Sequence, residues 1–183
     1  MNVLLLSGGI DSSAIAFWKR PDTCLTIDYG QPSFLGELRA ARAIAATVQA
    51  AHHVASVPLY KDPIGTDGYW PVRNQLLISV AAAMFGREAN LKILLGVLGT
   101  DVHSDCAKPF IATTNELFAV QGALIRVSAP AIDLNERELL SRSNFPLEKL
   151  GVTFSCHRSD LPCGDCPGCL KQSRVRTIVT AGA

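Results

Sequence analysis

An apolar strand that runs straight into a glycine turn and a hydroxyl-rich helix start constrains this chain most. The segment Leu4–Ser13 reads Leu-Leu-Leu-Ser-Gly-Gly-Ile-Asp-Ser-Ser. Its glycines let backbone N–H groups approach a ligand without an obstructing Cβ, and the following helix presents its positive end to an anion. Its serine hydroxyls add hydrogen-bond donors. We therefore predict a phosphate site formed by Leu6, Ser7, Gly8, Gly9, Ser12 and Ser13.

A carboxylate, Asp11, lies inside this loop. Because it cannot itself attract a phosphate, it suggests a bridging cation, and Mg²⁺ is the ion that prefers oxygen ligands beside phosphates. The expected ligand is ATP with Mg²⁺. The loop is neither a Walker loop nor a dinucleotide fingerprint, but its order S-G-G-x-D-S is similar to the pyrophosphate loop of ATP pyrophosphatases, which cleave ATP between the α and β phosphates. The alternative is a plain Gly-Gly turn.

Short apolar runs alternate with helical patterns along the chain of 183 residues, which is typical of one α/β domain with a parallel sheet covered by helices on both faces. The polar segment Pro58–Pro71 is expected to be a surface loop or lid. The expected strands are Val3–Leu6, Thr23–Asp28, His53–Val57, Lys92–Leu98 and Leu124–Ser128. The expected helices are Ser12–Arg20, Leu35–Gln49, Val72–Glu88, Phe110–Gln121, Glu136–Ser141 and a last one near Leu170–Val179.

The carboxyl ends of the expected strands define one crevice, because open parallel sheets bind ligands there, where the strand order reverses. The phosphate loop follows the first strand, Asp28 ends the second, and a polar run from Gly96 to Asp101 follows the fourth. Arg73 falls in the first turn of a long helix, where the helix dipole disfavours a cation. This position favours binding of a phosphate or carboxylate over an internal ion pair.

The segment after Gly151 changes character and becomes rich in cysteine. Its pattern Cys-x6-Cys-x2-Cys-x2-Cys can wrap a tetrahedral Zn²⁺, with glycines and a proline at the turns. Four thiolates leave no open position, so the metal would hold the tail in place and not touch substrate. An iron–sulfur cluster is the alternative metal centre. We predict an ATP-binding domain over 1–150 and a zinc-binding tail over 151–183, with ligands Cys156, Cys163, Cys166 and Cys169.

The charge of the chain is balanced, with 17 basic and 16 acidic side chains and a formal net charge of +1. This balance gives no overall case for nucleic acid as a partner. We also expect no membrane span and a cytoplasmic location, because no apolar run is long enough to cross a bilayer and the chain opens on a strand without a basic leader.

With both motifs in place, the chain resembles the 7-cyano-7-deazaguanine synthase family, QueC, over nearly its whole length. The resemblance implies a Rossmann-like fold of the adenine nucleotide α-hydrolase type, a structural zinc and a homodimer. It also implies that ATP activates the carboxyl group of 7-carboxy-7-deazaguanine, that ammonia then gives the amide, and that a second activation gives the nitrile. The matching motifs are Ser7–Ser12, Asp28–Gln31, Val72–Asn74, Gly96-Val97, Thr100-Asp101, Asp105-Cys106 and Thr153–Cys156.

The resemblance and the crevice together assign roles to the polar residues. Arg73 is expected to hold the substrate carboxylate or the α-phosphate, and Asp101 and Asp105 to accept hydrogen bonds from the donor edge of a guanine-like base, with loop capping as the alternative. The expected catalytic residues are Asp11, Arg73 and Asp101, and Asp28 and Gly96 join the phosphate loop in holding ATP. The expected substrate-binding residues are Tyr29, Gln31, Arg73, Asn74, Asp101 and Asp105.

The chain departs from the family at the rim of this crevice. A lysine that usually opens the helix after the fifth strand is replaced by Glu136, with Arg137 and Lys108 as candidate substitutes, and the loops before Ser33 and Asp105 differ or are shorter. Three alternatives to the biosynthetic enzyme therefore stay open. QueC-like proteins of antiphage systems, including type IV CBASS, can join a deazaguanine to a protein amine. The others are a nucleotide-binding module without catalysis and a transfer-RNA thiolation enzyme with Cys106 as sulfur carrier.

Overall fold

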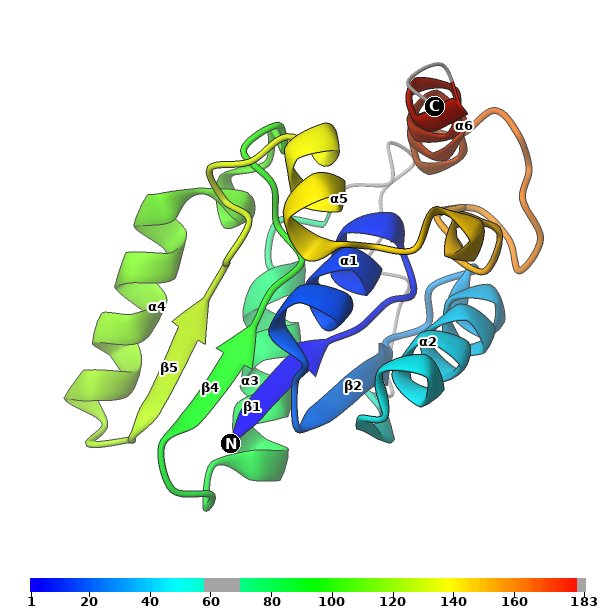
Figure 1. The fold of residues 1–183 in the computed structure, drawn as a ribbon. Coiled ribbons are helices and arrows are strands. Elements are labelled where there is room, and N and C mark those ends of the chain that lie inside the picture. Colours follow the sequence, from blue (N-terminus) through cyan, green and yellow to red (C-terminus); the bar gives the residue numbers. More distant parts are fainter. Residues whose placement is uncertain (58–69, 181–183) are drawn as a thin grey trace.

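The fold is an all-parallel five-stranded sheet with helices on both faces (Figure 1), and the computed structural model describes residues 1–57 and 70–180. The strand order is β3-β2-β1-β4-β5, so the chain moves outward from β1 to one edge and then returns to build the other. The order therefore reverses between β1 and β4. The strands are β1 (Asn2–Leu5), β2 (Thr23–Asp28), β3 (Ala51–Ser56), β4 (Leu91–Leu94) and β5 (Ile125–Ser128).

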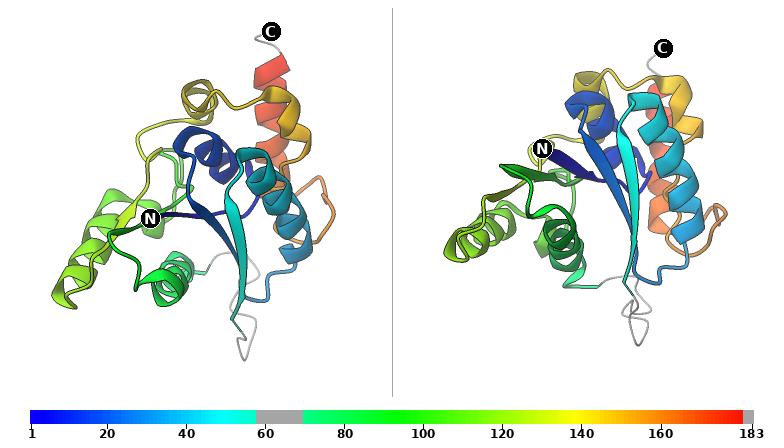
Figure 2. Two further views of the ribbon diagram at one scale, coloured as in Figure 1. Left: turned by 60° about the horizontal axis from the view of Figure 1, so that its bottom comes forward. Right: turned by 90° about the horizontal axis from the view of Figure 1, so that it is seen from below.

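The helices form two layers (Figure 2), because alternate residues of the buried strands point to opposite faces of the sheet. One core cluster joins Leu4 to the helices α1, α2 and α5, and the other joins Val3 to α3 and α4. The helices are α1 (Ile10–Lys19), α2 (Phe34–Val48), α3 (Arg73–Phe85), α4 (Lys108–Val120), α5 (Glu136–Ser143) and α6 (Pro167–Thr180), with 3₁₀ turns η1 (Ser104–Cys106) and η2 (Leu147–Gly151).

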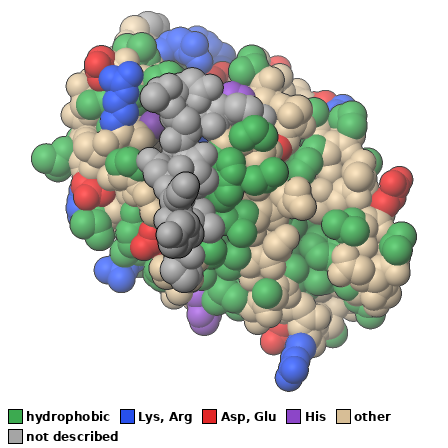
Figure 3. Space-filling view, turned by 180° about the vertical axis from the view of Figure 1, so that it is seen from behind, with side chains coloured by type: hydrophobic (Ala, Val, Ile, Leu, Met, Phe, Trp, Pro, Cys, Tyr) green, Lys and Arg blue, Asp and Glu red, His purple; other side chains and the backbone are tan. Residues whose placement is uncertain are grey.

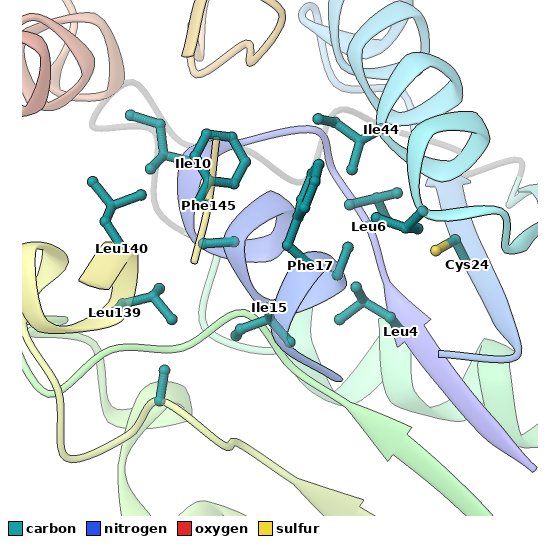
Figure 4. Packing of buried hydrophobic residues seen from close by; sticks show 14 of the residues in the cluster. Leu4, Leu6, Ile10, Ile15, Phe17, Cys24, Ile44, Leu139, Leu140 and Phe145 are labelled. Carbon is teal, nitrogen blue, oxygen red and sulfur yellow. The ribbon is translucent and has the colours of Figure 1, made fainter. Parts of the chain in front are cut away.

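The first core cluster fixes α1 against the sheet and so positions the loop before it. Phe17 packs edge-on against Phe145 at 5.1 Å between ring centroids, and Ile15 is fully buried (Figure 4). Val175 of α6 belongs to the same cluster, so the C-terminal helix is packed onto the main core.

The rear face of the molecule carries hydrophobic side chains among uncharged groups and few charges (Figure 3), and Met84 of α3 and Leu117 and Val120 of α4 are exposed hydrophobic residues. A groove of about 560 Å³ lies there, with Ile78, Phe110 and Phe118 in its lining. Leu117, at its rim, is half exposed. This face is opposite to the layer that carries α1 and α6.

The expected fold class is confirmed, and the element bounds differ mainly at one strand. β4 ends at Leu94 and not at Leu98, because the chain leaves the ladder after Leu95 donates to Ser128 O. The buried Val97 and Leu98 that follow form an apolar loop and not a continued strand. Most of the expected loop Pro58–Pro71 lies outside the described residues. Among the helices of the described part, none combines the length and apolar character needed to cross a bilayer.

Candidate functional site

The glycine loop after β1 is clamped between α2 and the C-terminal tail. Gly8 has φ +76°, and a Cβ there would lie 2.6 Å from the Ala40 Cβ and 2.8 Å from the Ala41 N. Its carbonyl oxygen accepts a hydrogen bond from Phe154 N at 2.9 Å. Only glycine fits both the left-handed backbone and the space, so the loop has one allowed course across α2.

The start of α1 places hydroxyls and free amides at the end of this loop. Gly9 is the N-cap and no side chain caps the helix, while the Ser12 hydroxyl donates to Gly9 O at 3.2 Å and lies 3.3 Å from the Ser7 hydroxyl. Because the first amides of a helix have no intrahelical partner, this end is electropositive and suited to an anion. Ser7 is exposed, whereas Ser13 is fully buried.

The loop after β4 closes onto the same helix start. A Cβ at Gly96 would lie 3.0 Å from the Ser12 Cβ and 3.1 Å from the Ser12 N. Glycine at this position therefore lets the β4 loop approach α1 at the point where the strand order reverses. Asp101 stabilises the loop, because its Oδ2 accepts a hydrogen bond from Leu98 N at 2.9 Å.

A lysine that sequence reasoning did not single out lies among three carboxylates at this helix start. Lys171 Nζ of α6 is 2.7 Å from Asp11 Oδ2, 3.8 Å from Glu136 Oε1 and 3.9 Å from Asp101 Oδ1. Arg174, one turn later in α6, pairs with Glu136 at 2.9 Å. The acids come from α1, the loop after β4 and α5, so the cluster joins three elements to the C-terminal helix.

Burial and neighbouring charges both shift the pKa values of this cluster. Burial raises the pKa of Asp11 above its ordinary value, and Asp101 and Glu136 raise it further, although Lys171 opposes this shift. Burial alone would lower the pKa of Lys171, but its three acidic neighbours outweigh that effect and raise it. Within the described residues, Asp11 Oδ1 is buried without a hydrogen-bond partner. An unpartnered carboxylate oxygen beside an anion site is a suitable ligand for Mg²⁺.

The corner after β2 is held by internal hydrogen bonds. Asp28 Oδ1 accepts from Gly30 N at 3.0 Å. The buried Gln31 amide accepts from Tyr29 N at 2.9 Å and donates to Ile27 O at 3.0 Å and to Glu37 Oε2 at 3.1 Å. The Gln31 amide thus braces the turn that presents Tyr29, and it is engaged within the protein.

Arg73 and Tyr29 meet at the mouth of α3. The Arg73 guanidinium lies close enough to the Tyr29 side chain to affect its pKa, and the Tyr29 ring lies 5.8 Å from the Trp70 ring. Burial raises the pKa of Tyr29 to about 12, with Glu37 adding to the shift and Arg73 opposing it. The arginine therefore lies in a partly buried, aromatic setting at the first turn of α3, as its position in the sequence predicts.

Asn74 and Asp105 pair with each other below this arginine. Asn74 Nδ2 donates to Asp105 O at 3.1 Å, and Asn74 N lies 3.4 Å from Asp105 Oδ2. Both side chains are buried. Burial, with help from Asp105 and Asp101, raises the pKa of the neighbouring Cys106 thiol to about 12. The thiol is thus held protonated, which does not suit a sulfur carrier.

The four tail cysteines gather their sulfur atoms within 4.8 Å of one another. Cys163 and Cys169 lie 3.9 Å apart, and Cys156 and Cys166 lie 4.0 Å apart. A tetrahedral Zn²⁺ with bonds of about 2.3 Å requires sulfur separations of about 3.8 Å, so the cluster fits this ion. Backbone amides support the sulfurs, because His157 N and Cys169 N each lie 3.4 Å from Cys166 Sγ. Four cysteine thiolates are also a ligand set that suits an iron–sulfur cluster.

The cysteine cluster also packs against α2, the helix on which the glycine loop lies. Phe154, Cys156 and Cys166 form an apolar group with Ala40 of α2. A separate cavity of about 500 Å³ lies behind it, between α2 and α6, with Arg39 and Arg176 in its lining. Its lining excludes the loop residues, so it is distinct from the crevice at the strand ends.

The structure thus brings most of the expected residues to one edge of the sheet. The Ser7 and Ser12 hydroxyls lie 3.3 Å apart, and Asp11 and Asp101 are bridged by Lys171. Gln31, Asn74 and Asp105 lie at the same edge with their polar groups used internally. Lys108 instead pairs with Asp133 at 2.5 Å on the surface. Lys171 was missed because its spacing from the cysteines does not reveal where α6 points.

Comparison with known proteins finds similar chains over nearly the whole length of this one. The family described as "Queuosine biosynthesis protein QueC" matches residues 1–67 and 61–177. A 7-cyano-7-deazaguanine synthase of a Nitratiruptor species is 30% identical over 216 residues, covering 99% of this chain and 94% of that protein. The protein of the same description from Trichodesmium erythraeum is 30% identical over 91% of both chains. The Nitrosomonas europaea protein is 29% identical over 91% of this chain and 88% of its own.

Proposed function

Because the chain belongs to the QueC family of queuosine biosynthesis proteins, we propose that it is an ATP-dependent enzyme that activates the carboxylate of 7-carboxy-7-deazaguanine and transfers the acyl group to an amine. The relatives named above are 7-cyano-7-deazaguanine synthases, and this chain spans nearly their whole length. With ammonia as the amine, the first product is the amide; a second ATP then activates the amide oxygen, and loss of AMP and two protons gives the nitrile.

One observation supports the ATP step above all others. Asp11, with a buried and unpartnered Oδ1, stands at the uncapped start of α1, directly after the glycine loop and at the strand switch point. A helix end that attracts phosphates, beside a carboxylate suited to Mg²⁺, matches the needs of a bound triphosphate. Asp11 and Asp101 would hold the ion, which neutralises charge on the departing pyrophosphate.

The proposed chemistry is two displacements in sequence. A carboxylate oxygen of the substrate attacks the α-phosphorus, the bond to the bridging oxygen of the β-phosphate breaks, and pyrophosphate leaves. The amine then attacks the acyl carbon, AMP leaves, and the amine loses a proton to solvent. The Ser7 and Ser12 hydroxyls and the first amides of α1 stabilise the charge that develops on the phosphates.

The substrate is proposed to lie between Arg73 and Asp101. Arg73 can pair with its carboxylate or with the α-phosphate, and Tyr29 and Trp70 offer aromatic faces for a planar base. Gln31, Asn74 and Asp105 are engaged internally, so their part in binding is to fix these neighbours. Zinc, held by the four cysteines, would keep the tail in place; a homodimer remains an expectation for light scattering to test.

Product mass spectrometry tests the proposal. The protein is incubated with Mg-ATP and 7-carboxy-7-deazaguanine, with ammonium chloride in one sample and none in another. We expect ammonium-dependent conversion to the amide or nitrile, with AMP and pyrophosphate released. Asp11→Ala should show neither the conversion nor the release of AMP and pyrophosphate. Full turnover by Asp11→Ala would contradict the assignment of the site.

A protein amine is the second candidate for the acceptor. Where the family has Arg-His after its Asp-Tyr-Gly-Gln motif, this chain has Pro32-Ser33, and its loop before Asp105 is short. A shorter rim leaves more room for a polypeptide end. AMP release that requires an added protein, with a mass gain on that protein, would identify conjugation as the reaction. Absence of turnover in every sample would instead favour a nucleotide-binding module.

A further inference from the structure

Lys171 reaches the loop at the other end of the chain through a single short contact. Its Nζ lies 2.7 Å from Asp11 Oδ2, across a sequence separation of 160 residues. Asp11 is in the first turn of α1, whose amides form the anion site. The side chain of Lys171 is about one quarter exposed, so it lies against the acids without being sealed from solvent.

The surrounding charge leaves this lysine with a task beyond neutralising a neighbour. Asp11, Asp101 and Glu136 bring three negative charges to the place where the proposed ATP phosphates would lie. Like charges at such distances repel strongly in a partly buried site. Lys171 contacts all three acids, whereas Arg174 contacts Glu136 from a more exposed position. An anion arriving at α1 therefore meets the Lys171 ammonium beside the helix amides.

The four-cysteine centre determines where this lysine points. Cys169, two positions before it, is in the first turn of α6, and its backbone amide contacts Cys166 Sγ at 3.4 Å. On the next turn the buried side-chain amide of Gln172 donates through Nε2 to Thr153 O at 2.8 Å, and Val175 is in the main core. The helix backbone is thus fixed on both sides of Lys171. The lysine side chain therefore loses less conformational entropy when it binds a phosphate.

We propose that Lys171 is a phosphate-binding residue of the nucleotide site and that the metal-bound tail delivers it there. The inference rests on the proposed ATP site. It also gives the cysteine centre a functional consequence. By holding the tail in place, the metal would set the position of a residue that binds the phosphates. Lys171 leaves Asp11 free for Mg²⁺ when it turns to a phosphate oxygen.

Calorimetric titration with Mg-ATP and with inorganic pyrophosphate tests the proposal. Lys171→Met removes the ammonium, and Arg174→Met is the matched control, because it removes a cation of the same helix that also contacts Glu136 but not Asp11. We expect Lys171→Met to weaken both ligands by about ten- to a hundredfold, the loss typical of one charged hydrogen bond. Arg174→Met should stay within about twofold of the wild type, the weight of a surface ion pair. Lys171→Arg should recover part of the loss.

Zinc content and thermal unfolding of each variant distinguish a lysine that binds phosphate from a lysine that only holds the tail in place. Equal zinc content with weakened binding supports the proposal. Equal affinity of Lys171→Met and Arg174→Met would overturn it, and so would a loss of zinc in both Lys171→Met and Lys171→Gln, which would make the lysine a tether. A wild-type protein that binds neither ligand would contradict the proposed function itself.

Discussion

Replacement of Gly8 by alanine should be among the most damaging single-methyl changes in this protein. The new Cβ would lie 2.6 Å from the Ala40 Cβ, 2.8 Å from the Ala41 N and 2.9 Å from the Glu37 O, while φ is +76°. The left-handed backbone costs about 1–2 kcal/mol for a residue with a Cβ. Overpacking against the backbone of α2 adds about 1–3 kcal/mol. We expect Gly8→Ala to lose about 2–5 kcal/mol of unfolding free energy.

Gly122→Ala is the control that isolates the crowding. Gly122 has φ +68°, close to that of Gly8, but a Cβ there meets nothing within 4 Å. It should therefore lose only the backbone cost of about 1–2 kcal/mol. Urea unfolding followed by circular dichroism measures both variants, and titration with pyrophosphate shows whether the loop still binds.

Equal stabilities of the two alanine variants would refute the reasoning, because the difference comes only from the contact with α2. A Gly8→Ala protein that keeps both wild-type stability and pyrophosphate affinity would show that the loop can move away from α2. The assigned close packing of the loop would then be wrong.

Three further outcomes are expected. Metal removal by a chelator should release the start of α6, so hydrogen exchange of Gln172 and Val175 should accelerate and ATP affinity should fall; unchanged exchange would show that the metal does not order the tail. The raised pKa of Cys106, about 12 instead of 9.0, lowers its thiolate fraction at pH 8 by roughly a thousandfold, so iodoacetamide should modify this thiol only after unfolding, as peptide mass spectrometry can report; rapid modification of the native protein would restore the sulfur-carrier alternative. Asn74→Ala leaves the buried Asp105 carbonyl without its donor and should lower the unfolding free energy, measured with urea, by about 1–3 kcal/mol. An unchanged unfolding free energy would show that this hydrogen bond does not stabilise the fold.

The fold class and the gathering of the four cysteines could be predicted from the sequence, because both depend on local patterns. Val3 and Leu4 mark a strand by their apolar neighbours, and the cysteine spacing sets the ligand set before any tertiary contact is known. The same local logic misjudged the end of β4. Val97 and Leu98 are as apolar as a strand, but they are buried as a loop whose amide is capped by Asp101.

The charge arrangement of the site depends on tertiary structure and could not be predicted in the same way. Lys171 meets Asp11 only because α6 packs against α5 and so brings the lysine to the start of α1. Glu136 appeared to be the loss of a cation, yet it accepts from Arg174 and lies near Lys171. Likewise, Gln31 and Asp105 have the chemistry of ligands in the sequence, and the fold uses their polar groups to brace turns.

Substrate-dependent exchange of labelled pyrophosphate into ATP tests the central claim most directly, because exchange requires reversible formation of an acyl adenylate before any amine reacts. With Mg²⁺ and 7-carboxy-7-deazaguanine present and ammonia absent, we predict exchange by the wild-type protein and none by Asp11→Ala. Exchange that needs no carboxylate substrate, or that persists in Asp11→Ala, would contradict adenylation at this loop.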